Sequence, residues 1–569
     1  MYSNNIGHIV FASSPGKKAA WPRGGSTTAL NKGNVQMLTR RSVLIMGAAS
    51  IAAGPMLLSS ARAATPKNIV VMAMAIDDII GGFDPAEAYE LSNFEICGNI
   101  YRSLVTVDPA DSTKLVGDLA EAWEISKDGL TMTFHIRKDV LFSSGNPLTS
   151  EDVIFSLHRV VKLNKAVGYL LTQFGWNTGN IDKLIRATDK YTVVLTLPVL
   201  QASGIVLSCL AGLPGSIVDK AETLAHEVDG DLGNAWLKTH SAGSGSYRLV
   251  EWLASDRVVL EANPHAAVAP KTPRLVIRHV ADPASQLLLL KKGDIDIARN
   301  LGSDQLKSIS GEVGLSIDQA DSLTLIYMVM NMALPQFQKR EVRQAIKWAV
   351  DYDAIAQNIT PKLWNAWQSF LPKGTPGAIT DLPFKKDIAQ AKALLAKGGY
   401  PDGFSVTIDH PNSWPYADVA QAIQADLAAI GVKGELLAGE ASQVFGKMRA
   451  RQHQMGIGYW AGDYVDPNGN SVPFCSDPDD SDNTTQKTAA WRSHFADAEL
   501  TAAVASAAQE LDEGKRLNMY TEVQKKWNER SPFAFLLQQV GVAVVQSNVT
   551  GLSLGLAANF TRYTELAKT

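Results

Sequence analysis

The sequence predicts an α/β protein, because segments with strand-like and helix-like hydrophobic patterns alternate along most of the chain. The run from Ile69 to Ile76 is apolar, and Thr131 to Ile136 carries apolar residues at alternate positions, so both are expected to be strands. Tyr191 to Leu197 is a third such segment. Because 569 residues exceed the length of one ordinary domain, two or three packed units are expected.

Three segments carry apolar residues at helical spacing. Thr149 to Asp152 is an N-cap signature, and the apolar residues that follow predict a helix. Further helices are expected along Val342 to Val350 and along Val419 to Ile430, with Gly431 placed to end the latter. A polar run at 476–488 predicts a surface loop, and joints between packed units are expected near 243–247, 323–332 and 530–533.

Charge is distributed unevenly along the chain. The first 63 residues contain seven basic and no acidic side chains. The rest of the chain therefore has 46 of the 53 basic residues and all 57 acidic ones, which gives it a formal net charge of −11. A globular part this acidic argues against binding nucleic acid or anionic lipid. Cationic or zwitterionic solutes are easier for it to accommodate.

Three cysteines, Cys97, Cys209 and Cys475, are too few and too scattered to form a disulfide framework. One bridge can form in an oxidising compartment, and the sequence does not choose the pair. The alternative is that all three are buried thiols packed as small apolar groups.

Residues 37–63 have the three parts of a signal peptide: the basic pair Arg40-Arg41, an apolar stretch and small residues ending at Ala63. The segment at 39–44, TRRSVL, resembles a twin-arginine export signal. The alternative, a permanent anchor, requires a longer apolar run. Residues 1–36 resemble neither a signal nor a domain, and Met37 is a candidate true start. The mature protein is expected to be soluble and periplasmic.

We therefore expect the precursor to be cleaved after Ala63 and exported in a folded state. Edman sequencing of periplasmic protein should start at Ala64. Replacing Arg40 and Arg41 with lysine should block export, because the twin-arginine route requires that pair. Undiminished export of the double variant would contradict this assignment.

Five blocks of the mature chain resemble the extracellular solute-binding proteins, family 5, which serve peptide and nickel importers of the ABC type. The longest is LAEAWEISKDGLTMTFHIRKDVLFSSGNPLTSEDVIFSLHRV at 119–160. The others are GSGSYRLVEW at 243–252 with Asn263-Pro264, GDID at 293–296, KREVRQAIKWAVD at 339–351 and WAGDYVDP at 460–467. Ser246 departs from the family, which usually has proline there.

The resemblance implies a two-lobed periplasmic-binding-protein clamshell of type II, with an extra subdomain in the N-terminal lobe and a ligand bound between the lobes. Lobe I would comprise 64–110, 246–325 and 530–569, the extra subdomain 111–245, and lobe II 326–529. It also implies an importer component that works with ABC permease subunits and a cytoplasmic ATPase. We expect a monomer that binds a short peptide; nickel chelates, opines and oligosaccharides are the alternatives.

The resemblance also indicates candidate binding residues. In peptide-binding relatives the first acidic residue of the D-Y-x-D-P motif pairs with the ligand's α-ammonium group, and Asp463 has that position here. The other motif carboxylate, Asp466 before Pro467, is more naturally a cap on the following turn.

Three aromatic residues, Trp414, Tyr459 and Trp460, are candidates for apolar walls of the binding site, with core packing as the alternative for each. Oligopeptide-binding relatives bind the ligand carboxylate with an arginine three places before the tryptophan. Ile457 stands there in this chain, which leaves Arg449 and Arg451 as substitutes.

A secreted hydrolase is the remote alternative. The sequence has no G-x-S-x-G motif, and Gly456 to Gly462 is one residue too long for a dinucleotide fingerprint. Ten dispersed histidines include no H-E-x-x-H motif, so no assembled metal site is indicated. We therefore expect no catalytic residues, no metal ligands and no cofactor, and a protein that is not an enzyme.

Overall fold

The structure is a computed structural model that describes residues 65–569. The predicted signal peptide at 37–63 and the segment 1–36 lie outside the described residues. The signal peptide therefore stays a prediction.

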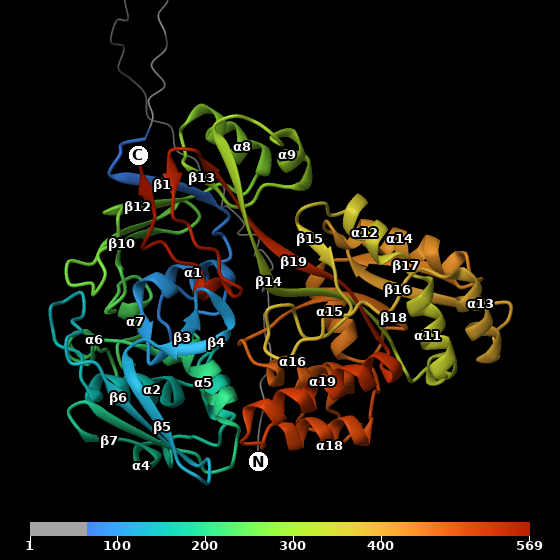
Figure 1. Cartoon of the computed structure of the whole chain (residues 1–569), viewed down its shortest axis with the longest axis horizontal. Helices are drawn as coiled ribbons and strands as arrows, with labels where there is room; N and C mark the ends of the chain where they lie inside the picture. The colour runs from blue at the N-terminus through green and yellow to red at the C-terminus, as the bar shows by residue number, and fades with distance from the viewer. Residues whose placement is uncertain (1–64) are drawn as a thin grey trace, which may run out of the picture. The chain divides into compact units, whose positions relative to one another are not determined.

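An 11-stranded mixed sheet runs through the described part of the chain (Figure 1). Its order is β10-β11-β12-β1-β13-β19-β14-β18-β16-β17, and β15 pairs with β19 in addition. The strands are β1 (Ile69–Met74), β10 (Tyr247–Leu253), β11 (Arg257–Ala262), β12 (Arg274–His279), β13 (Ile297–Ala298), β14 (Leu315–Met330), β15 (Trp364–Ala366), β16 (Ser405–Pro411), β17 (Lys433–Gly439), β18 (Met455–Ala461) and β19 (Phe533–Gln546).

The two longest strands, β14 and β19, form the middle of this sheet and pair antiparallel from Leu315↔Gln546 to Val329↔Phe533. Their register shifts between Asp321 and Leu325. The joint predicted near 323–332 therefore lies largely within a continuous strand, next to a local irregularity in the ladder. Such irregularities bend and twist a strand locally.

The first half of the sheet belongs to the segments predicted as lobe I. Here β1 pairs parallel with both β12 and β13. Apolar side chains from β1, β10, β12 and the helix α1 form one core, and β13, β19, α8 and α9 contribute to a second. The other elements of these segments are α1 (Leu91–Ile100), β2 (Arg102–Ser103), β3 (Val105–Asp108), α8 (Pro283–Lys292), α9 (Ser303–Ser308), β20 (Val549–Thr550), η2 (Ala558–Phe560) and β21 (Ala567–Lys568).

Residues 111–245, predicted as the extra subdomain, contain a separate four-stranded antiparallel sheet, β5-β6-β8-β7. Its side chains and those of α2 and α5 fill one large core that includes Phe134, Leu157 and Trp176. The elements are β4 (Asp111–Gly117), β5 (Ala120–Ile125), β6 (Thr131–Ile136), α2 (Ser150–Leu163), α3 (Tyr169–Thr172), α4 (Ile181–Leu184), β7 (Ile185–Asp189), β8 (Thr192–Thr196), α5 (Ser203–Ala211), η1 (Leu213–Gly215), β9 (Ser216–Ile217), α6 (Lys220–Ala225) and α7 (Asn234–Leu237).

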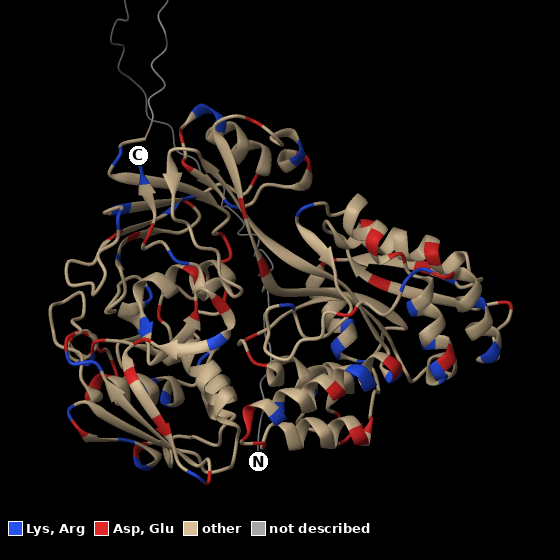
Figure 2. Cartoon of the chain, viewed as in Figure 1, with Lys and Arg blue, Asp and Glu red and all other residues tan. Residues whose placement is uncertain are grey.

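Helices cover the second half of the sheet, and two separate hydrophobic cores lie between them and the sheet. One core joins the sheet to α11, α12, α13 and α14, and the other joins it to α15–α19. Figure 2 shows acidic and basic residues side by side on α19, where Lys525 pairs with Glu522. The helices are α10 (Pro335–Gln338), α11 (Arg340–Ala349), α12 (Tyr352–Asn358), α13 (Ile388–Lys397), α14 (Tyr416–Ala428), α15 (Ala441–Arg449), α16 (Pro467–Cys475), α17 (Ala489–Arg492), α18 (Ala498–Ala507) and α19 (Glu513–Arg530).

The local predictions agree with these elements. Strand β6 has the predicted limits, and α2 begins with the expected capping box, in which Thr149 and Asp152 each bond the other's backbone. Helix α14 ends at Ala428, and Gly431 follows it with φ +88°. All three cysteines are free and buried, which is the second of the two alternatives.

Within residues 65–569, no helix has both the length and the apolar character needed to cross a membrane.

Candidate functional site

The candidate site follows from the direction of three strands. Strands β17 and β18 both run parallel to β16, so their carboxyl ends point the same way. In open α/β sheets, ligands bind outside the carboxyl ends of such strands. The WAGDYVDP block occupies this position after β18, and Asp463 lies two residues beyond the end of that strand.

Asp463 accepts a hydrogen bond of 2.9 Å from the hydroxyl of Tyr89. The Tyr89 hydroxyl is also 3.1 Å from that of Tyr169, so two tyrosines from the first half of the chain accompany one carboxylate from the second. Tyr89 precedes α1 and Tyr169 begins α3. The fold therefore brings together residues 374 positions apart in the sequence.

Burial raises the pKa of Asp463 above the ordinary aspartate value. Hydrogen bonds from Tyr169 and Tyr89 lower the pKa and offset only part of that effect. No lysine or arginine within residues 65–569 forms an ion pair with Asp463. A carboxylate in this state gains stability from any cation placed beside it.

Asp466, in the same loop as Asp463, holds this loop in place. Asp466 is the N-cap of α16 and accepts a 2.9 Å hydrogen bond from the backbone N–H of Asn468, which confirms the predicted capping role. Its two oxygens also accept bonds from Arg516 at 3.1 and 2.8 Å, and both side chains are almost completely buried. The hydroxyl of Tyr520 donates to the Asn468 side chain.

The same loop contacts helix α5 of the first half. The hydroxyl of Ser208 donates to the carbonyl of Val465 at 3.2 Å. Just before α5, the backbone N–H of Ala202 donates to the carbonyl of Ala508 at 2.8 Å. Segments 65–245 and 326–529 therefore meet around Asp463 through hydrogen bonds and through apolar side chains such as Val465 and Tyr464.

The three predicted aromatic residues have different surroundings. Trp460 is partly buried: its Nε1 donates to Asn470 at 3.0 Å and its ring packs edge-on against Phe474. Tyr459, within β18, is 40% exposed, and Trp414, between β16 and α14, is 48% exposed; both are large fractions for aromatic side chains. These two are therefore available to a ligand, whereas Trp460 also serves the packing of α16.

The two predicted arginines also differ. Arg451 bonds to Asp480 and to His494, and its guanidinium lies 4.3 Å from the Trp491 ring centroid. Its charge is thus already paired within the protein. Arg449, at the end of α15, is exposed and has no ion pair among the described residues, so it remains the candidate for a ligand carboxylate.

Sequence reasoning missed three residues near the predicted ones. Tyr89 and Tyr169 belong to no motif, and only the fold brings them to Asp463. Arg492, at the end of α17, has no ion pair among the residues described, and both burial and nearby Arg449 lower its pKa. Arg449 and Arg492 are two nearby cations without ion pairs among the described residues, which indicates a place for an anionic group. Only the structure shows that they are close together.

Within 65–569, no group of three or more histidine, cysteine, aspartate or glutamate side chains is arranged to hold a metal ion. The hydrogen-bonding groups around Asp463 can hold a polar ligand with a positive end.

Comparison with protein families identifies the family of the chain. Residues 114–482 match the model for bacterial extracellular solute-binding proteins, family 5. The chain belongs to this family. Its fold is the type II clamshell of periplasmic binding proteins, and it is a solute-binding protein.

Individual relatives cover most of this solute-binding protein. It is 27% identical to the "Probable D,D-dipeptide-binding periplasmic protein DdpA" of Escherichia coli strain K12, over 86% of this chain and 92% of that protein. A periplasmic binding protein from Helicobacter pylori, solved in complex with the peptide STSA, has a TM-score of 0.70 at 23% identity and covers 88% of this chain and 98% of its own. A protein from Agrobacterium tumefaciens R10 solved with mannopinic acid has a TM-score of 0.69 at 23% identity, over 89% and 100%.

Proposed function

We propose that this solute-binding protein captures a short peptide in the periplasm and delivers it to an ABC importer. The observation that carries the proposal is Asp463: a partly buried carboxylate with a raised pKa and no cationic partner among the described residues. An α-ammonium group is a cation that fits such a position. The D,D-dipeptide-binding name of the Escherichia coli relative supports the same ligand class.

The physical argument is one of charge pairing. A peptide enclosed between two lobes loses water around both its ends, and desolvation of an unpaired charge outweighs any attraction. Asp463 meets the need at the positive end through charge-assisted hydrogen bonds, which are the strong kind. Arg449, with Arg492 near it, is the proposed partner for the negative end.

Exposed aromatic side chains complete the proposed site. Tyr459 packs against Phe445 with ring centroids 5.2 Å apart and lies 6.0 Å from the Tyr416 ring. Together with Trp414, these three aromatic rings offer an apolar surface that does not require a peptide side chain of one particular shape. Such a surface tolerates different side chains, while the charged ends set the orientation of the ligand.

An opine is the second candidate, since one structural relative was solved with mannopinic acid. Under either ligand we propose a monomer that docks on permease subunits coupled to a cytoplasmic ATPase and catalyses no reaction. The two candidates are separated by mass spectrometry of the ligand released when protein purified from its native host is denatured. A peptide mass supports the proposal, and an opine mass contradicts it.

Ligand binding should close the protein. The shift of register in β14 offers a place to bend, so a saturating dipeptide should reduce the radius of gyration measured by small-angle scattering. The same peptide should raise the melting temperature by mass action. The N-acetylated dipeptide is the matched control, because it lacks the ammonium group. An unchanged scattering curve at saturation would contradict closure.

A further inference from the structure

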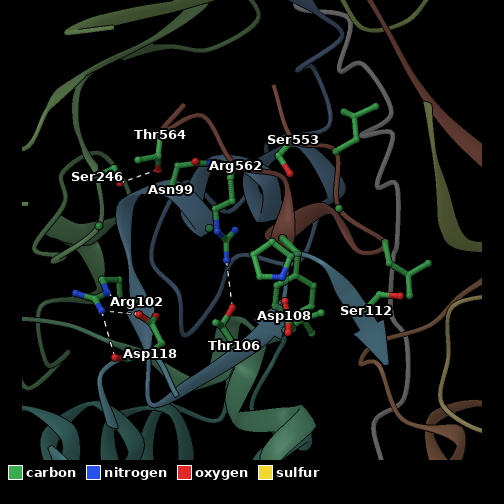
Figure 3. A pocket seen from close by; sticks show the side chains of 18 of the residues that line it. Asn99, Arg102, Thr106, Asp108, Ser112, Asp118, Ser246, Ser553, Arg562 and Thr564 are labelled. Carbon is green, nitrogen blue, oxygen red and sulfur yellow. Dashed lines mark hydrogen bonds and ion pairs between the residues drawn. The ribbon is translucent and has the colours of Figure 1, made fainter. Parts of the chain in front are cut away.

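A cavity of about 230 Å³ lies in the first half of the chain. Figure 3 shows its lining, which comes from the end of α1, the β3–β4 hairpin and the segment between β20 and β21. None of the residues predicted for ligand binding lines it, and neither Tyr89 nor Tyr169 does. A water molecule occupies about 30 Å³ of liquid, so the space suits a small organic molecule.

Arg562 is the central charged residue of this cavity. Its Nη1 donates to the carbonyl of Asn559, and its Nη2 lies 3.5 Å from the Thr106 hydroxyl (Figure 3). No carboxylate among the described residues forms an ion pair with it. Burial lowers the pKa of Arg562, and the attraction of Asp118 offsets only part of that effect.

Other buried arginines in the first half of the chain have carboxylate partners. Arg159 binds both oxygens of Asp84, and Arg299 binds Glu95. A buried guanidinium is normally matched by a carboxylate, because its desolvation is otherwise uncompensated. The half-buried Arg562 guanidinium has carbonyl and hydroxyl partners and lies 5.8 Å from the Phe560 ring centroid, but it has no carboxylate partner among the described residues and therefore retains a capacity to bind an anion.

A second donor lines the same cavity. The Nε of Arg102 donates a hydrogen bond of 2.7 Å to Asp118, and its Nη2 forms an ion pair with the same residue. Its Nη1 is buried without a hydrogen-bond partner among the described residues. A buried donor left unpaired costs free energy that an incoming acceptor would recover. Arg102 also lines a smaller cavity beside the first one, together with Arg562.

The remaining groups limit the charge of the ligand. The hydroxyl of Ser553 lies on the wall and can donate to an anion, whereas the Ser112 hydroxyl already donates to the carbonyl of Gly374 at 3.2 Å. Asp108 also lines the cavity, and its negative charge opposes any anion, a doubly charged one more strongly than a singly charged one. With Arg102 paired to Asp118, Arg562 is the cation of the lining that forms no ion pair among the described residues, so it is the group that can pair with one carboxylate.

We propose that this cavity binds a small organic anion with a single carboxylate, held by Arg562 and by the free Nη1 of Arg102. The site is separate from the one proposed around Asp463. A guanidinium presents two parallel N–H groups that fit a carboxylate, which explains the preference over a neutral amide of the same shape.

The test compares propionate with propionamide, its neutral analogue, by thermal shift and by calorimetric titration of the full mature protein. Propionate should raise the melting temperature and propionamide should not. In Arg562→Gln the affinity for propionate should fall at least tenfold. Arg278→Gln is the matched control, because it removes the same charge from an exposed position on β12 and should leave propionate binding unchanged.

Two results would overturn the proposal. One is propionate binding that persists in Arg562→Gln; the other is binding that is lost in Arg449→Gln, which would place the carboxylate at the site near Tyr459. If Arg562→Gln does not fold, Arg562→Lys keeps the charge and loses the paired N–H groups, so affinity should still fall. A crystal structure with propionate should show it in this cavity, and density elsewhere alone would exclude the site.

Discussion

Replacing Asp463 with asparagine is expected to weaken peptide binding by roughly two orders of magnitude or more. The substitution keeps the shape of the side chain and its ability to accept the hydrogen bond from Tyr89, and it removes only the charge. Removing one side of an enclosed ion pair typically costs about 3–5 kcal/mol. Calorimetric titration of both proteins with a dipeptide measures the difference directly.

The N-acetylated dipeptide is the control for this prediction. It has no ammonium group, so wild-type protein should bind it about as weakly as Asp463→Asn binds the free peptide. Equal affinity of wild type and variant for the free peptide would show that Asp463 is structural. The peptide assignment would then lose the residue on which it rests.

The pH dependence of binding has a definite sign. Burial raises the pKa of Asp463, so its carboxylate takes up a proton at a higher pH than an exposed aspartate does. The protonated form cannot pair with an ammonium group, and affinity should therefore fall as the pH decreases through that raised pKa. Asp463→Asn should lose this dependence.

The same shift predicts the stability of the ligand-free protein. Above the ordinary aspartate pKa of about 3.9, the unfolded state releases this proton more readily than the native state, so ionisation of Asp463 lowers native stability. Asp463→Asn removes that cost. Its melting temperature without ligand at neutral pH should equal or exceed that of the wild type.

Arg516→Met is expected to reduce the free energy of unfolding by about 3–5 kcal/mol. Arg516 and Asp466 are 1% and 2% exposed, so the variant leaves the Asp466 carboxylate buried without its cation. Burial already raises the pKa of Asp466, and Arg516 is the main group that opposes this effect. Urea unfolding followed by circular dichroism measures the change.

The matched control is Arg340→Met, which breaks an ion pair on the same half of the chain. Arg340 and Glu529 are 56% and 62% exposed, so the expected change is at most about 1 kcal/mol. Adding Asp466→Asn to Arg516→Met should restore part of the lost stability, because the buried charge is then gone. A loss below 1 kcal/mol for Arg516→Met would show that the pair does not hold the loop.

Short-range patterns in the sequence were enough to predict the class of the fold. Strand β6 and helix α2 were predicted closely, because alternation of apolar residues and a capping box depend on neighbours in the chain. The joint predicted near 323–332 lies largely within the long strand β14, which the sequence did not predict. The sequence within such a strand does not reveal its pairing, because the partners of β14 in β18 and β19 are more than 120 residues away along the chain.

For the candidate site, the sequence by itself determined the family, the position of the WAGDYVDP block and the capping role of Asp466. The tertiary structure decided which groups lie beside Asp463, that Arg451 is already paired, and that Arg449 and Arg562 are without ion pairs among the residues described. The physical reason is range. Capping and strand alternation act over a few residues, whereas desolvation and charge pairing depend on what the folded chain brings within a few ångströms, as with Tyr89 and Asp463.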